Sequence, residues 1–175
     1  MLDSPEIKYV RSGDADVAYA TFGEGPRNLL IISGLGAHVD LIWQIAKSAE
    51  FLRKLATFRR VIFMDRRGSG ASDPVPLMAV PTWEEMAEDI TAVLDATGSD
   101  VTDLLALNEV GPIAILVAAM HPERVGSLVL VNTAARYAAA EDYPIGVAPD
   151  VIDAICEVMA SSWGSEEFAV GSGGS

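Results

Sequence analysis

Apolar and polar residues follow one another along this chain in two different patterns. Residues 7–12 and 16–22 alternate between apolar and polar side chains on either side of Gly13-Asp14, which predicts an antiparallel hairpin. Later runs are apolar throughout, as is typical of strands buried on both faces of a sheet. These runs are residues 28–33, 61–64, 101–107 and 127–132.

Segments with helix signals separate these runs. The segments are residues 41–56, 82–96, 112–120 and 148–163. The second begins with Thr82 and Glu85 in the spacing of a capping box, and it stops before Gly98. Strands that alternate with helices indicate an α/β fold. We therefore expect a mostly parallel sheet with helices on both faces and an N-terminal antiparallel hairpin.

Composition and charge narrow the class of partner. The chain has 25 acidic and 12 basic residues among 175, a net charge of −13, so neither nucleic acid nor an anionic membrane is expected to bind it. No apolar run reaches the roughly 18 residues of a membrane span, and the first residues lack the features of a signal peptide. The single Cys156 rules out an internal disulfide and fits a cytoplasmic protein.

Glycine-rich segments give no support for a cofactor. Residues 34–36 and 68–70 lack the Lys-Ser/Thr of a P-loop, and neither fits the G-x-G-x-x-G pattern of dinucleotide binding. Cysteine and histidine do not occur at metal-binding spacing. No cofactor or metal is expected.

Four motifs occur in a fixed order over residues 7–136. They are Ser33-Gly34-Leu35-Gly36, a D-x-R-G-x-G-x-S stretch at 65–72, Glu88-Asp89-Ile90 with the segment 94–98, and His121-Pro122-Glu123-Arg124-Val125 with 128–130. In this order they resemble the N-terminal half of an α/β-hydrolase-fold protein. Within that superfamily, the residues of these motifs are most similar to those of hydrolase-like domains attached to class III adenylate cyclases or response regulators of actinobacteria. Those domains commonly carry Ser-Glu-Gly-Gly where this chain has Asn108-Glu109-Val110-Gly111.

By this resemblance, Asn108 stands at the nucleophile position of a G-x-S-x-G elbow. A carboxamide cannot be activated as an attacking oxygen by a neighbouring base, so this position predicts no nucleophile. Asparagine does tolerate the left-handed conformation that an elbow residue adopts. Val110 replaces a glycine that lets helix and strand approach closely, and it predicts a relaxed or widened turn.

The resemblance also implies an oxyanion hole beside Gly34, with the backbone N–H groups of Leu35 and Glu109 as donors. Because these are main-chain groups, such a pocket can bind a small carbonyl or carboxylate without a nucleophile. The alternative is that both N–H groups only cap or fill turns.

No catalytic base can be assigned. The acid and the histidine of the family's triad come after the sixth strand, and this chain ends before either position. His121 fits an ordinary helix end, while His38 follows the 34–36 loop and is a weak candidate for a catalytic role. The charges of residues 65–67 are expected to pair locally in a structural loop.

Three segments are expected along the chain. Residues 1–136 form the hydrolase-like core with its first six strands, and 137–170 form an acidic helical segment that corresponds to the start of the family's cap. Residues 171–175 have the composition of a linker or an expression scar.

The sequence favours a catalytically inactive domain that acts as a sensor, regulatory or interaction module. The alternative is an incomplete or mutated fragment of a true serine- or aspartate-nucleophile hydrolase of the esterase or lipase kind. A sixth strand left at the sheet edge invites pairing, which predicts self-association or a complementing C-terminal segment.

Overall fold

The computed structural model describes residues 4–34, 36–76 and 78–165. Contacts within the chain divide it into two compact units, Met1–Ala135 and Arg136–Ser175. We describe each unit by itself.

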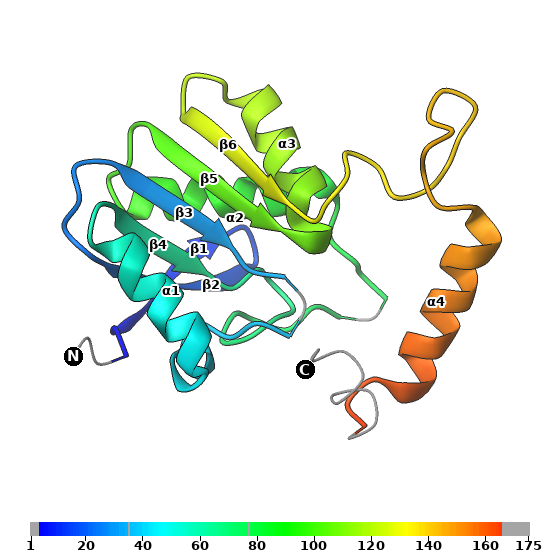
Figure 1. The fold of residues 1–175 in the computed structure, drawn as a ribbon, viewed down its shortest axis with the longest axis horizontal. Coiled ribbons are helices and arrows are strands. Elements are labelled where there is room, and N and C mark those ends of the chain that lie inside the picture. Colours follow the sequence, from blue (N-terminus) through cyan, green and yellow to red (C-terminus); the bar gives the residue numbers. More distant parts are fainter. Residues whose placement is uncertain (1–3, 35, 77, 166–175) are drawn as a thin grey trace. The chain divides into compact units, whose positions relative to one another are not determined.

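The first unit is built on a six-stranded sheet (Figure 1). Its strands are β1 (Ile7–Ser12), β2 (Ala15–Phe22), β3 (Asn28–Ile32), β4 (Arg60–Met64), β5 (Thr102–Leu107) and β6 (Val125–Val131). They lie in the order β1-β2-β4-β3-β5-β6. The pairs β1–β2 and β2–β4 are antiparallel, whereas β3 is parallel to both β4 and β5, and β5 is parallel to β6. The predicted mostly parallel sheet is confirmed.

The N-terminal hairpin is also confirmed. Ser12 pairs with Ala15, so Gly13 and Asp14 form a two-residue turn. Gly13 has φ +56°, in the left-handed region that such turns require.

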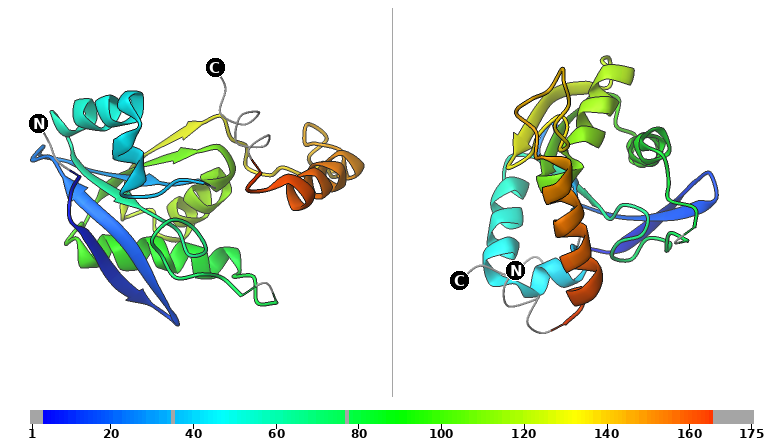
Figure 2. Two further views of the ribbon diagram at one scale, coloured as in Figure 1. Left: turned by 90° about the horizontal axis from the view of Figure 1, so that it is seen from below. Right: turned by 90° about the vertical axis from the view of Figure 1, so that its right-hand side faces the viewer.

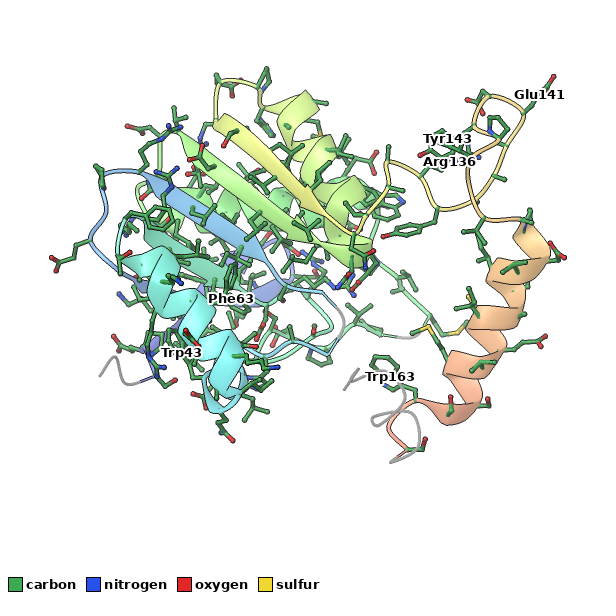
Figure 3. The ribbon with its side chains drawn as sticks, viewed as in Figure 1. Trp43, Phe63, Arg136, Glu141, Tyr143 and Trp163 are labelled. Atoms are coloured by element: carbon green, nitrogen blue, oxygen red, sulfur yellow. The ribbon has the colours of Figure 1, made fainter. Side chains whose placement is uncertain are left out.

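Helices cover both faces of this sheet (Figure 2). On one face, α2 (Trp83–Ala96) and α3 (Gly111–Met120) pack on alternate strand residues, among them Leu30, Ile62 and Leu104. On the other face, α1 (Ala46–Ala56) packs on the intervening residues, among them Ile31 and Phe63. Figure 3 shows Phe63 and Trp43 on the side of the sheet that α1 covers.

The segment before α1 differs from the prediction of one helix over residues 41–56. Leu41–Gln44 forms a short 3₁₀ turn, and Ile45 is extended, with φ −89° and ψ 107°. The tertiary environment accounts for the break, because Trp43 packs edge-on against Phe22 with ring centroids 4.9 Å apart. A tertiary contact of this kind outweighs a helical sequence pattern.

The capping box of α2 is present as predicted. The Thr82 hydroxyl accepts the Glu85 N–H at 3.1 Å, and the Glu85 carboxylate accepts the Thr82 N–H at 2.7 Å. The helix ends at Ala96, and Gly98 follows with φ +61°.

The second unit contains an irregular segment followed by α4 (Pro149–Ser162). In the irregular segment Arg136 forms an exposed ion pair with Asp142 at 3.4 Å, close to Tyr143 (Figure 3). Along α4, Val151, Ile155 and Val158 are each about half exposed. None of the helices in the described ranges is both long and apolar enough to cross a membrane.

Candidate functional site

The turn between β5 and α3 has the backbone of an elbow. Leu107 ends the strand in an extended conformation, and Asn108–Val110 form a single 3₁₀ turn that runs into α3. Asn108 has φ +57°, a left-handed value that costs most non-glycine residues about 1–2 kcal/mol and asparagine less. The sharp strand-to-helix turn is therefore kept at the position where the resemblance places a nucleophile.

Val110, which we expect to relax or widen this turn, is part of the hydrophobic core. Its side chain is completely buried in the core between the sheet, α2 and α3, with no exposed surface. The close approach falls instead at Gly111, where an added Cβ would lie 2.8 Å from the Cβ of Thr133. A valine is accommodated because the position that needs glycine is the next one along the chain.

Asn132 is a partner of Asn108 that the sequence reasoning missed. Its Nδ2 donates to the Asn108 Oδ1 at 2.8 Å, and its own φ is +52°. The two asparagines directly follow β5 and β6, and the carboxyl ends of adjacent parallel strands meet at one edge of a sheet. The signal was an asparagine directly after each of two apolar runs.

The Glu109 side chain turns back toward the loop after β3. An added Cβ on Gly34 would lie 3.0 Å from Glu109 Oε1 and 3.1 Å from Oε2, so the carboxylate packs directly on Gly34. Glu109 Oε1 is 3.4 Å from Arg66 Nη2. Leu35, the other predicted oxyanion donor, lies outside the described residues.

Asp65 forms hydrogen bonds with the segments that follow β3 and β4. Its carboxylate is fully buried and accepts the N–H groups of Val39 and Ala71, both at 2.9 Å, and the Ser33 hydroxyl at 3.3 Å. Burial raises the pKa of the Asp65 carboxyl, although these hydrogen bonds and the nearby His38 act in the opposite direction. Asp65 thus fixes the loop after β3 against the loop after β4.

Arg67 pairs with distant residues, which corrects the expectation of local pairing. Its guanidinium donates to both oxygens of the Asp89 carboxylate in α2, at 2.6 and 2.7 Å, and to Asp14 of the hairpin turn at 3.3 Å. Asp89 is 1% exposed and the Arg67 side chain 10%, so this is a buried ion pair. The hydrogen bond to Asp89 raises the pKa of the Arg67 guanidinium.

The two histidines lie in ordinary structural positions. The Nδ1 atom of His38 accepts the Asp40 N–H at 3.2 Å. His121 follows the last residue of α3, with Nδ1 3.9 Å from the Glu123 carboxylate.

A hollow of about 290 Å³ opens on the α1 face of the sheet, next to the elbow along the chain. It is lined by Ile31, Ile42, Lys47, Ser48, Phe51, Leu52, Phe63 and Leu107. The last of these directly precedes Asn108. The polar elbow and the apolar hollow are thus adjacent in sequence and differ in chemistry.

Two curated proteins illustrate what the chain is similar to. "Putative carbamate hydrolase RutD" from Azorhizobium caulinodans is 35% identical over 130 residues, which cover 74% of this chain and 46% of that protein. A pimeloyl-[acyl-carrier protein] methyl ester esterase from Salmonella heidelberg is 26% identical over 137 residues, 78% of this chain and 48% of that protein. The chain spans less than half the length of these relatives.

A solved structure and a family model give the same assignment. A hydrolase from Pseudomonas aeruginosa PA01 superposes with a TM-score of 0.68 and 26% identity, over 92% of this chain and 54% of that chain. The family model for the alpha/beta hydrolase fold matches residues 27–157, well over half of the sequence. The chain therefore belongs to the α/β-hydrolase-fold family.

Proposed function

We propose that this chain is a non-catalytic α/β-hydrolase-like module that binds a small ligand or a partner. The observation that carries the proposal is Asn108 at the elbow, with φ +57° and its side-chain carbonyl engaged by Asn132. By the resemblance this is the place of a nucleophile, but a carboxamide offers no oxygen that a base can activate. The elbow can therefore hold a ligand without transferring an acyl group from it.

The ligand we propose is a small carbonyl or carboxylate compound. Its support is the resemblance, which implies main-chain donors around Gly34 and Glu109 that do not depend on a nucleophile. We further propose a regulatory or sensor role in the cytoplasm, of the kind that accompanies class III adenylate cyclases. Its support is the similarity of Asn108-Glu109-Val110-Gly111 to the Ser-Glu-Gly-Gly of those domains.

Backbone amide NMR tests the binding proposal. Short-chain carboxylates, amides and ketones are titrated into labelled protein, and the affected amides are assigned. We expect saturable shifts at Gly34, Asn108 and Asn132, and unchanged amides at the opposite edge of the sheet, such as that of Thr102. Shifts spread evenly over the surface, or none at the elbow, would contradict the proposal.

We also propose that β6 pairs with a further strand, either from a second copy or from a complementing segment. Its support is the edge position of β6 in the described sheet, where Val129, Leu130 and Val131 are 40–46% exposed. Unpaired N–H and C=O groups on an apolar edge favour strand addition.

A second candidate is that the chain is part of a true hydrolase. The observation in its favour is that the chain spans less than half of the curated relatives. In that case the whole protein would supply the missing acid and histidine, and its natural residue at position 108 would be serine or aspartate. Sequencing the parent gene decides the matter, because an asparagine codon at position 108 rules this candidate out.

A further inference from the structure

The carboxylate of Glu109 lies against the loop that the resemblance implies for oxyanion binding. Both of its oxygens are within about 3 Å of where a Gly34 side chain would begin, and the Glu109 side chain is only 33% exposed. A negative charge of the protein itself is thus held next to Gly34.

Arg66 is the cation that faces this carboxylate. Its side chain is 18% exposed, and the Nη2–Oε1 distance to Glu109 is 3.4 Å. Carboxylates bind guanidinium groups best through two parallel hydrogen bonds of about 2.7–2.9 Å. The observed contact is longer than that, so this hydrogen bond is weaker than the best of such pairs.

A second atom of Arg66 shows that its hydrogen bonding is incomplete. Among the residues that the structure describes, none forms a hydrogen bond with the buried Nε. An unsatisfied buried donor is costly, and the Nε and Nη2 hydrogens point from one edge of the guanidinium plane. One carboxylate placed on that edge would satisfy both donors. Burial lowers the pKa of Arg66 and Glu109 raises it, which fits a cation that depends on a nearby anion.

We propose that Arg66 anchors the carboxylate group of a ligand, and that Glu109 occupies this place until the ligand displaces it. This inference rests on the proposed ligand-binding function and narrows the ligand class to carboxylates. A neutral carbonyl compound that displaced Glu109 would leave a largely buried guanidinium without a counter-charge. A carboxylate ligand avoids this cost, because its negative charge takes the place of the Glu109 charge beside Arg66.

The consequence is that the protein's own side chain competes with the ligand. The apparent dissociation constant equals the intrinsic one divided by one minus the fraction of molecules in which Glu109 covers Arg66. If that fraction is about nine-tenths, removing the Glu109 charge raises affinity about tenfold.

The test compares butyrate with butyramide, its uncharged analogue, by calorimetry or NMR titration. The proteins are the wild type, Glu109→Gln, Arg66→Lys and the control Glu84→Gln. The control makes the same change of charge on an exposed residue in the first turn of α2. We expect butyrate to bind Glu109→Gln about tenfold more tightly than the wild type, with the control unchanged. Arg66→Lys keeps the charge but loses the planar fork, so butyrate affinity should fall.

Two results would overturn the inference. One is equal binding of butyrate and butyramide; the other is a butyrate affinity that Glu109→Gln leaves unchanged or lowers, including no binding to that variant at all. Circular dichroism of each variant guards against a misfolded sample, and the conservative Glu109→Gln carries the test if Arg66→Lys does not fold. If butyrate shifts the elbow amides but ignores both substitutions, the proposed function stands and this inference fails. Ester turnover that depends on Asn108 would instead overturn the proposed function.

Discussion

At the scale of single residues, the elbow depends on two asparagines that adopt left-handed backbone conformations. Asn108 and Asn132 have φ values of +57° and +52°, and they are joined by a 2.8 Å hydrogen bond. The residue type serves two purposes, because asparagine tolerates this conformation and its side chain both donates and accepts.

Replacing Asn108 separates these two purposes. Asn108→Ala loses the hydrogen bond and places a Cβ in the left-handed region without local compensation, so the free energy of unfolding should fall by about 1–2 kcal/mol. Asn108→Gly also loses the side-chain contacts but adopts the left-handed conformation without strain, so it should cost less than the alanine variant. Chemical denaturation measures both, and a glycine variant less stable than the alanine variant would contradict the backbone account.

Asp65 predicts a pH-dependent difference in stability. Burial raises the pKa of the Asp65 carboxyl in the folded state above its unfolded value of about 3.9. The carboxyl therefore contributes most to stability at a pH below the unfolded pKa, where it is protonated in both states. That contribution is lost as the pH rises through the folded pKa. The variant Asp65→Asn cannot ionise, so the wild type should lose stability relative to it as the pH increases from about 4.

Urea denaturation of both proteins across this pH range provides the measurement. Other titrating groups cancel in the difference between the two proteins. A difference that stays constant with pH, or one in which the wild type gains on the variant as the pH rises, would show that the hydrogen bonds from Val39, Ala71 and Ser33 outweigh burial.

At the scale of elements, one ion pair joins the loop after β4 to α2. Arg67 contacts Asp89 through two hydrogen bonds of 2.6 and 2.7 Å, and it also donates to the Ser12 carbonyl oxygen at the end of β1. The pair thus connects three elements at one edge of the sheet.

Removing one partner of this pair should be strongly destabilising. Arg67→Met leaves the Asp89 carboxylate buried and unpaired, at an expected cost of about 3–5 kcal/mol in unfolding free energy. The exposed pair of Arg11 and Asp16 serves as the control, and Arg11→Gln should change stability by about 1 kcal/mol or less. Similar small losses in both variants, measured by thermal or chemical unfolding, would exclude a structural role for the buried pair.

The elements themselves were largely predictable, because their signals are local. The Thr82–Glu85 capping box and the Gly13-Asp14 turn are set by neighbouring residues, and both occur where the sequence indicates. The break at Ile45 was not predicted, since it depends on the packing of Trp43 against Phe22, far away in sequence. The same distinction holds for the site. Its motif identified Asn108, but the contact of Asn108 with Asn132 and the Glu109–Arg66 pair join distant segments, so the local sequence did not predict them.

At the scale of the whole chain, β6 lies at one edge of the described sheet. The segment from Val125 to Val131 has no charged residue, although charged side chains commonly protect such edges from pairing. In the described sheet β6 pairs with β5 on one side only.

We expect the purified protein to be heavier than its monomer mass of 18.5 kDa in solution. Light scattering coupled to gel filtration measures this mass. Val129→Lys places a charge on the edge and should shift the protein toward the monomer. A wild type that stays monomeric at high concentration would contradict self-association through β6.

The central claim is that the elbow retains the geometry of a nucleophile site without its reactivity. Hydrolysis of short-chain p-nitrophenyl esters tests this most directly, with the wild type and Asn108→Ala assayed side by side. We predict that the wild type hydrolyses these esters no faster than Asn108→Ala. Saturable turnover by the wild type that Asn108→Ala abolishes would contradict the account.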